Sequence, residues 1–385
     1  MIRKADMKKN IVILIGFIPI PRIYKRIEVE KSIGNLHLIC WDRGNNMLLP
    51  PTGDGYETHI IGINAESDPI RRIIPYHRFS KKAKKLLETI KPRIIHVQGL
   101  DMLKIAVSYK KRASNKVSII YEVADLHRLI IDQQKNLFKR CIRNYLRDED
   151  KRLEPYYELL LITSERFREA YFNSFVSDEK ILYMPNIPHL TAFEKFNKKK
   201  DSSRFVVGYI GSIRYKEQIK NLIEASKRCR INLLIAGYEE GDDEIEQLCK
   251  NEPHIEWIGR FDFEEQAAYL YGKCDVIYSV YNADLNNVRV ALPNKLYESV
   301  YCEMPLIVAK NTYLAQIVKE WGVGLSVSHT DVVELCDVIN KLCNDKELYN
   351  QIVNNCKNKK DEIDLEKYNN VLKTKILTIM GLVHD

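Results

Sequence analysis

A lysine and a glutamate three residues apart are the pair in this chain whose types and spacing most readily suggest chemistry. Lys295 and Glu298 lie in segment 289–303, after the apolar run 276–280, and Pro293 predicts a helix start because its fixed φ suits the first helical position. Helix N-termini attract anions, so Lys295 could meet a diphosphate while Glu298 accepts hydrogen bonds from a sugar hydroxyl. The alternative is a surface ion pair, stabilising by about 0.2–0.5 kcal/mol.

A second candidate for phosphate binding follows the first apolar run of the second half. Gly211 opens a small-residue turn that lets backbone approach a ligand, and Arg214 and Lys216 could neutralise phosphate oxygens. The turn has neither the GxGxxG pattern nor a Walker A lysine. A strand-to-helix turn with solvated cations therefore remains the alternative.

Three polar residues follow an expected strand of the first half. Glu122, Asp125 and His127 lie at or just after the end of a run that finishes near Val123. Carboxylates and a histidine at the carboxyl end of a strand are candidates for acid–base catalysis or hydroxyl recognition. Asp125 could instead cap the next helix.

The sequence does not predict a catalytic metal or disulfides. Nine histidines form no HExxH motif or His-x-His cluster, and Asp148-Glu149-Asp150, which has DxD spacing, continues a charged helical pattern instead of ending a strand. The nine cysteines are odd in number, scattered and free of CxxC pairs. Reduced thiols in a cytoplasmic protein are the expectation.

Charge divides the chain into two unlike halves. Residues 1–200 carry 38 lysines and arginines against 23 aspartates and glutamates, a net charge of +15, whereas residues 201–385 carry 22 against 29, a net charge of −7. The basic half could face nucleic acid or an anionic membrane, but a nucleic-acid recognition motif and an aromatic-rich basic stripe are missing, so no nucleic-acid partner is expected. The apolar run 11–20 is too short to span a bilayer and indicates a buried strand.

Apolar strands alternate with amphipathic helices in both halves, which predicts two parallel sheets wrapped by helices, the doubly wound α/β class. We expect an N-terminal domain over 1–190, a linker over 191–203, a second domain over 204–362 and a final helix over 363–385 that returns to the first domain. The expected first-half strands are 11–15, 36–41, 59–63, 94–97, 117–123 and 159–163. The expected second-half strands are 205–210, 231–236, 255–258, 276–280, 306–309 and 324–327.

A basic amphipathic stretch, residues 135–147, has two interpretations. It is either a helix packed on the core or a helix lying on an anionic membrane, where each cation contributes about 1 kcal/mol. Its apolar residues are Leu137, Phe138, Cys141, Ile142, Tyr145 and Leu146, and its cations are Lys135, Lys139, Arg140, Arg143 and Arg147.

The chain resembles the retaining glycosyltransferases of family 4, which have the GT-B fold of two Rossmann-like domains facing a central cleft. The resemblance spans nearly the whole chain and is strongest in the second half. It rests on Val-Gly-Tyr-Ile-Gly-Ser-Ile (207–213), Leu-Leu-Ile-Ala-Gly (233–237), Ile-Glu-Trp-Ile-Gly (255–259), Ala-Leu-Pro-Asn-Lys-Leu-Tyr-Glu (291–298), Cys-Glu-Met-Pro-Leu-Ile-Val (302–308) and the segments 94–101 and 121–126.

The resemblance implies transfer of a hexose-type sugar from a nucleotide-sugar, UDP- or GDP-linked, to a lipid-linked or oligosaccharide acceptor. It implies no metal, because cations and helix dipoles stabilise the departing diphosphate. Glu298 matches the family's ribose-binding glutamate. The residues that we expect in donor binding are Gly211, Ser212, Arg214, Lys216, Gly237, Arg260, Asn294, Lys295 and Glu298, and those that we expect in catalysis are Glu122, Asp125, His127, Arg214 and Lys295.

Some positions depart from the family pattern. Val290 stands where a glutamate is common, Ala124 where a histidine is common, and Ser212 and Glu217 where an arginine and a lysine are usual. Three functions follow: a cytoplasmic glycosyltransferase at the inner face of the plasma membrane, building capsular or extracellular polysaccharide; a nucleotide-sugar 2-epimerase; or a non-catalytic partner subunit. Turnover without an acceptor distinguishes the epimerase, and binding without turnover distinguishes the partner subunit.

Overall fold

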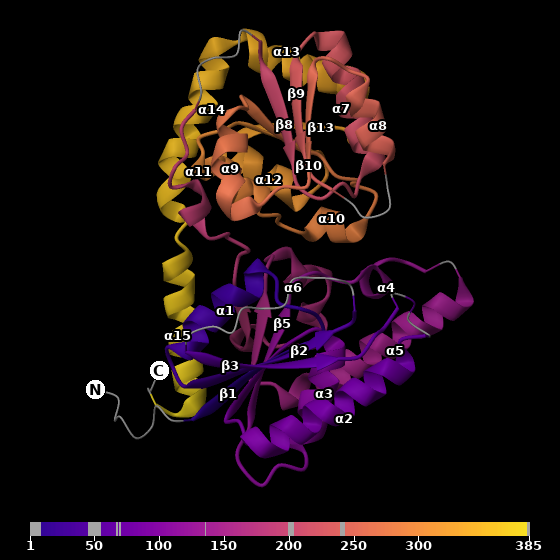
Figure 1. Ribbon diagram of the computed structural model, residues 1–385, viewed down its shortest axis with the longest axis vertical. Helices are drawn as coiled ribbons and strands as arrows, with labels where there is room; N and C mark the ends of the chain where they lie inside the picture. Colours follow the sequence, from indigo (N-terminus) through magenta and orange to yellow (C-terminus); the bar gives the residue numbers. More distant parts are fainter. Residues whose placement is uncertain are drawn as a thin grey trace. The chain divides into compact units, whose positions relative to one another are not determined.

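The chain divides into two compact units, each built on one parallel sheet. The computed structural model describes residues 9–44, 55–66, 68, 71–134, 136–198, 204–238 and 243–382 (Figure 1). Unit 1 comprises Met1–Pro185 and Glu366–Asp385, and unit 2 comprises Asn186–Leu365. Lys135 and most of the charged run at 198–203 lie outside the described residues.

Unit 1 contains a seven-stranded parallel sheet in the order β3-β2-β1-β4-β5-β6-β7. The six expected strands are present, with ends shifted by up to three residues, and a seventh is added. β7 escapes the sequence pattern because three residues show no periodicity. The strands are β1 (Asn10–Ile15), β2 (Asn35–Asp42), β3 (Tyr56–Gly62), β4 (Ile94–Gln98), β5 (Ser118–Val123), β6 (Leu159–Ile162) and β7 (Ile181–Tyr183).

Helices connect these strands and cover the sheet. They are α1 (Pro21–Lys31), α2 (Ile73–Ile90), α3 (Leu100–Lys110), α4 (Arg128–Ile131), α5 (Leu137–Leu153) and α6 (Arg166–Ala170). Residues 148–150 lie within α5, as their charged helical pattern predicts. No helix in the described parts of the chain combines the length and the apolar character needed to cross a lipid bilayer.

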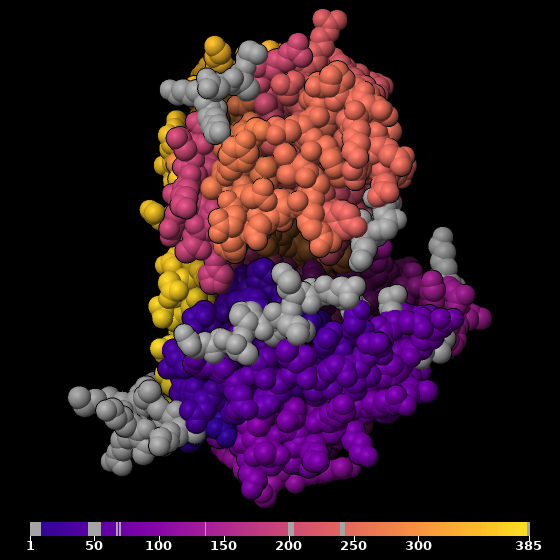
Figure 2. Space-filling view, in the orientation of Figure 1, coloured from indigo at the N-terminus to yellow at the C-terminus, as the bar shows by residue number. Residues whose placement is uncertain are grey.

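The last helix of the chain, α15 (Leu365–Met380), packs into the core of unit 1. Leu372 and Ile376 are fully buried in a cluster that includes Ile11 of β1, Ile23 of α1 and Leu38 of β2. Figure 1 shows α15 beside α1, and Figure 2 shows its yellow surface against the indigo surface of the N-terminal segments. Segments from both ends of the sequence therefore share one hydrophobic core.

Unit 2 contains a six-stranded parallel sheet in the order β10-β9-β8-β11-β12-β13. Its strands are β8 (Val206–Ile210), β9 (Asn232–Ala236), β10 (Ile255–Gly259), β11 (Val276–Ser279), β12 (Leu306–Ala309) and β13 (Gly324–Val327). Its helices are α7 (Lys216–Cys229), α8 (Glu244–Lys250), α9 (Phe263–Gly272), α10 (Asn286–Val290), α11 (Lys295–Tyr301), α12 (Tyr313–Trp321), α13 (Val332–Asn344) and α14 (Lys346–Lys359).

All nine cysteines of the chain, in both units, are free thiols.

Two sequence expectations for unit 2 are wrong. Pro293 does not begin a helix: α11 begins at Lys295 with Asn294 as its N-cap, and the Pro293 carbonyl accepts a hydrogen bond from the Leu296 N–H at 3.2 Å in a tight turn before it. The polar sequence of residues 282–289 predicts a loop, but the short helix α10 begins within it at Asn286. Its Val288 is buried, so one apolar residue among polar neighbours anchors the turn.

Replacing Ile376 of α15 by alanine is expected to destabilise unit 1 by about 2–5 kcal/mol, because it removes a fully buried side chain. The matched control is Val371→Ala on the same helix, where 41% exposure limits the expected change to about 0.5 kcal/mol. Urea unfolding followed by Trp41 fluorescence measures the effect on unit 1, in a Trp257→Phe/Trp321→Phe background that leaves one tryptophan. Equal midpoints for both variants would contradict the packing described.

Candidate active site

In unit 2, three glycines bring the carboxyl ends of neighbouring strands close together. The Gly211 N–H donates to the Ala236 carbonyl at 2.8 Å, and the Gly237 N–H donates to the Gly259 carbonyl at 2.9 Å. A Cβ atom on Gly237 would lie 1.9 Å from the Gly211 carbonyl oxygen, so only glycine fits there. The loops after β8, β9 and β10 therefore form one continuous edge, where ligands bind in doubly wound sheets.

Lys295 and Glu298 of α11 form a mostly buried ion pair at this edge. Glu298 is 1% exposed and Lys295 13% exposed, and the lysine Nζ contacts Glu298 Oε2. The Tyr271 hydroxyl of α9 donates to the same oxygen, and burial together with the Glu298 charge raises the pKa of Tyr271. Lys295 Cε lies 3.6 Å from the position that a Gly211 Cβ would occupy. The two candidate motifs of unit 2 thus meet in space.

Arg214 lies three residues after Gly211 in the loop after β8, and its charge influences Tyr281. Burial raises the pKa of Tyr281 to about 12 against the hydrogen bond from Ser279; the Glu298 charge raises it further and the Arg214 charge lowers it. The charges of the buried Glu298 carboxylate and of the exposed Arg214 guanidinium therefore both act on the Tyr281 hydroxyl. The Tyr281 ring lies 5.1 Å from the Tyr215 ring. Tyr215 and Tyr281 were not predicted as site residues, although they follow the carboxyl ends of β8 and β11.

The remaining predicted donor contacts lie along the same edge without converging so closely. Asn294 accepts a hydrogen bond from the Asn186 side chain, and the exposed Arg260 guanidinium lies 4.6 Å above the Tyr238 ring. Lys216 is the first residue of α7. Ser212 is exposed, and its carbonyl accepts a hydrogen bond from the hydroxyl of Tyr209 at 2.5 Å.

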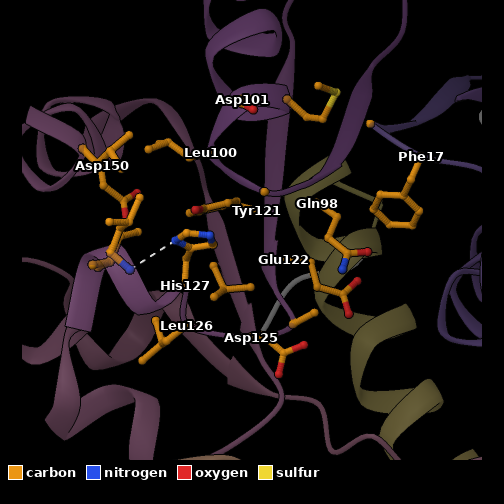
Figure 3. A pocket seen from close by; sticks show the side chains of 18 of the residues that line it. Phe17, Gln98, Leu100, Asp101, Tyr121, Glu122, Asp125, Leu126, His127 and Asp150 are labelled. Carbon is orange, nitrogen blue, oxygen red and sulfur yellow. Dashed lines mark hydrogen bonds between the residues drawn. The ribbon is translucent and has the colours of Figure 1, made fainter. Parts of the chain in front are cut away.

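Unit 1 has its own pocket, with a volume of about 580 Å³, at the carboxyl ends of β1, β4 and β5 (Figure 3). Its apolar wall includes Phe17, Ile73, Leu126, Ile142 and Leu146. Its polar groups include Arg43, Arg72, Gln98, Asp101, Glu122, Asp125, His127 and Asp150. The three first-half candidates, Glu122, Asp125 and His127, therefore line one cavity.

Glu122 is fully buried and both of its carboxylate oxygens are paired. Arg26 Nη2 donates to Oε1 at 3.0 Å, while Arg26 Nε and His96 Nε2 each lie 3.2 Å from Oε2. Burial alone would raise the pKa of Glu122, but Arg26 and His96 hold it well below its usual range. Glu30 contacts the other nitrogen of His96. This geometry favours a positioning role for Glu122 over direct contact with a substrate.

His127 and Asp125 are exposed to the pocket. His127 caps α4, and its Nδ1 accepts a hydrogen bond from the Leu129 N–H at 3.2 Å (Figure 3). Partial burial, aided by Arg72 and Arg128, lowers the pKa of His127, so the ring is neutral at pH 7. Because Nδ1 accepts, the proton of the neutral ring is on Nε2. His127 can therefore donate a hydrogen bond, which leaves Asp125 as the better base.

Among the residues described, no group of three metal-ligating side chains lies at either site.

Solved structures identify the class of fold. A sucrose-phosphate synthase from Thermosynechococcus elongatus is similar with a TM-score of 0.72 at 15% identity, over 98% of this chain and 100% of that one. Anabaena Alr3699/HepE, solved with UDP and glucose, is similar with a TM-score of 0.73 at 14% identity, over 96% and 100%. WaaG, a glycosyltransferase involved in lipopolysaccharide biosynthesis, gives 0.67 at 12% identity, over 94% and 98%. These likenesses show the GT-B fold.

Sequence comparison identifies the family. Residues 191–359 match the family described as glycosyl transferases group 1. The succinoglycan biosynthesis protein ExoL of Rhizobium meliloti (strain 1021) is 25% identical over 315 residues, which cover 78% of this chain and 76% of ExoL. Residues 191–359 are therefore a domain of the group 1 glycosyltransferases, known as GT4, a family of retaining enzymes that use nucleotide-sugar donors.

The buried cluster around Glu122 is expected to make unit 1 less stable as the pH rises from about 6.5 to 9. Burial alone would lower the pKa of His96, but Glu30 and Glu122 raise it from 6.5 to about 9. Between these values the native state binds more protons than the unfolded state, so stability is complete below pH 6.5 and falls towards pH 9. Thermal melts followed by Trp41 fluorescence in the single-tryptophan background should show this slope.

A His96→Gln/Glu30→Gln variant should flatten the slope, because it removes the histidine whose pKa is raised and replaces its buried partner by a neutral amide. His77→Gln, a substitution of an exposed histidine on α2, should leave it unchanged. A slope that persists in the double variant would assign the pH dependence to other groups.

Proposed function

We propose that this glycosyltransferase adds a hexose-type sugar to a lipid-linked saccharide acceptor during synthesis of a cell-surface polysaccharide, at the cytoplasmic face of the membrane. The convergence of Gly211, Lys295 and Glu298 at one edge of the unit 2 sheet, with Arg214 in the loop that follows Gly211, carries the proposal, because it joins an anion-binding turn to a buried carboxylate. The names of ExoL, a succinoglycan biosynthesis protein, and WaaG support the choice of polysaccharide.

The donor would bind through its diphosphate and its ribose. Lys295 and Arg214 supply two positive charges where negative charge develops on the departing nucleoside diphosphate, which lowers the barrier to breaking the glycosidic bond. Glu298, whose carboxylate is fixed by Lys295 and Tyr271, accepts hydrogen bonds from the ribose hydroxyls. Lys216, Arg260 and Asn294 extend the binding edge, and the nucleotide of the donor is UDP or GDP.

The acceptor hydroxyl would enter the pocket of unit 1. Asp125 accepts the hydroxyl hydrogen bond, and His127 Nε2 donates one to a neighbouring sugar oxygen. Glu122 holds its side of the pocket in place through Arg26 and His96. The mixed lining, apolar at Ile142 and Leu146 of α5 and polar at the strand ends, suits a sugar attached to a lipid.

The exposed surface of helix α5 supports the proposals of a lipid-linked acceptor and of a membrane contact. Leu137, Phe138 and Tyr145 are 68%, 67% and 57% exposed, so much of the apolar side of the helix does not pack on the core. Lys139 and Arg140 are exposed beside them, and Ile142 of the same helix lines the pocket. Apolar side chains with neighbouring cations are the composition that binds anionic lipid surfaces.

Removing the charge of Lys295 is expected to lower kcat/KM for sugar transfer by about 10²–10³-fold, the usual loss when one group that stabilises a developing negative charge is deleted. Lys295→Met keeps the length of the side chain, and Glu298→Gln should raise the Kd for the nucleoside diphosphate. Turnover of UDP- and GDP-sugars measures kcat/KM, and calorimetric titration with UDP and GDP measures the Kd.

Lys250→Met, at an exposed lysine on α8, is the matched control and should retain full activity. An unchanged kcat/KM in the folded Lys295→Met variant would show that Lys295 does not stabilise the departing diphosphate. Conversion of the donor without an acceptor would favour the epimerase, and binding without turnover on any acceptor pool would favour the partner subunit.

The membrane contact is expected to depend on both the apolar and the basic residues of α5. Wild-type protein should float with vesicles of phosphatidylglycerol and not with phosphatidylcholine alone, and Leu137→Ser/Phe138→Ser or Arg140→Glu/Arg143→Glu should abolish flotation. Lys81→Glu/Lys85→Glu on α2 controls for net charge, because these lysines are also exposed in unit 1. An equal loss of flotation in that control would show that the net charge of the protein, and not the surface of α5, causes the binding.

A further inference from the structure

Two histidines and a glutamate meet on the edge pair of strands in unit 1, away from the pocket. In the parallel register of β2 and β3, His37 lies opposite Glu57, and His59 follows Glu57 by two residues on the same face. The two imidazole rings are stacked with centroids 5.5 Å apart. This cluster could not be predicted from the sequence, because the Glu-x-His pair on β3 becomes a three-residue cluster only when strand pairing adds His37 from β2.

The ligand atoms of the three side chains lie in mutual contact. His37 Nδ1 is 3.2 Å from His59 Nε2 and 3.2 Å from Glu57 Oε2, and His59 Nε2 is 3.6 Å from Glu57 Oε1. One nitrogen of a neutral imidazole carries either a proton or a lone pair. His37 Nδ1 therefore cannot form two full hydrogen bonds, one as donor and one as acceptor, with the groups that face it. A cation among the three atoms would satisfy all of them at once.

The spacing also matches a known coordination geometry. Zinc binds imidazole nitrogen and carboxylate oxygen at about 2.0–2.2 Å, and tetrahedral angles then separate neighbouring ligand atoms by roughly 3.3–3.5 Å. The His37–His59 separation is 3.2 Å, and the two histidines lie 3.2 and 3.6 Å from different oxygens of the Glu57 carboxylate, all close to this value. One ligand atom from each of the three side chains lies within 4.8 Å of the other two. The histidines are 16% and 19% exposed and Glu57 is 64% exposed, so the cluster is framed by the sheet yet open to solvent on one side.

We propose that His37, Glu57 and His59 bind one divalent transition-metal ion, of which Zn²⁺ is the natural probe, with water as the fourth ligand. Two imidazoles and one carboxylate favour zinc and its neighbours over the hard cations Mg²⁺ and Ca²⁺. His37 lies near the amino end of β2, whereas the pocket is at the carboxyl ends of the strands. The ion is therefore structural: it fastens the edge strand β3 to β2 and takes no part in sugar transfer.

The test is metal binding by full-length protein that has been freed of metal with a chelator. Wild type should bind one equivalent of Zn²⁺ in competition with a chromogenic chelator, show the visible absorption of tetrahedral Co²⁺, and gain roughly 3 °C or more in Tm with Zn²⁺ in excess. His37→Gln and His59→Gln should each weaken binding by at least about tenfold, since loss of even an outer-shell partner of a metal ligand usually weakens binding by about that much.

Glu57→Gln provides a second test at an exposed position, in case the half-buried histidines are needed for folding. His329→Gln is the matched control, because His329 lies 3.5 Å from the single carboxylate Asp284 without a second histidine. Equal Zn²⁺ affinity in wild type and in the His37, His59 and Glu57 variants would overturn the proposal, as would the absence of a Tm shift. Sugar transfer is not the readout, so failure here is separate from failure of the proposed enzyme activity.

Discussion

A carboxylate held almost wholly out of water is the interaction on which the site of unit 2 depends. Burying a charge is costly unless it is paired and hydrogen-bonded, and Glu298 satisfies this condition through Lys295 and Tyr271. Lys295 is one turn away on α11, whereas Tyr271 comes from α9. The Tyr271 hydrogen bond therefore joins α9 to α11 at the ligand-binding edge. The ion pair sets Lys295 beside Gly211 before a ligand arrives, which is the preorganisation that electrostatic catalysis requires.

Unit 1 uses the same principle for a different result. Glu122 is compensated by Arg26 from α1 and His96 from β4, so it is fixed in the wall of the pocket. Asp125, three residues later, is exposed to the pocket instead. Two carboxylates close together in sequence are thus separated into one that maintains the shape of the pocket and one that can meet a hydroxyl. Their environments, not their residue types, distinguish these roles.

Much of the fold is predictable from the sequence, since long apolar runs alternating with amphipathic helices define both sheets. The errors have local causes: three-residue β7 has no readable period, and the Pro293 turn precedes α11 instead of beginning it. Pairs that depend on neighbours in sequence, such as Lys295 and Glu298, were also predictable. Contacts made through strand register or helix packing were not. Tyr271 reaches Glu298 from another helix, and His37 reaches His59 from another strand.

The position of α15 has a consequence for synthesis on the ribosome. Domains usually fold in order as the chain emerges, starting from the N-terminus. Here the first strands and α1 share their core with Leu372 and Ile376, which are translated only after all of unit 2. Most of unit 2 therefore emerges while unit 1 still lacks part of its core. The nascent unit 1 must keep its apolar surface exposed, within reach of chaperones, until the last turn of the final helix has left the exit tunnel.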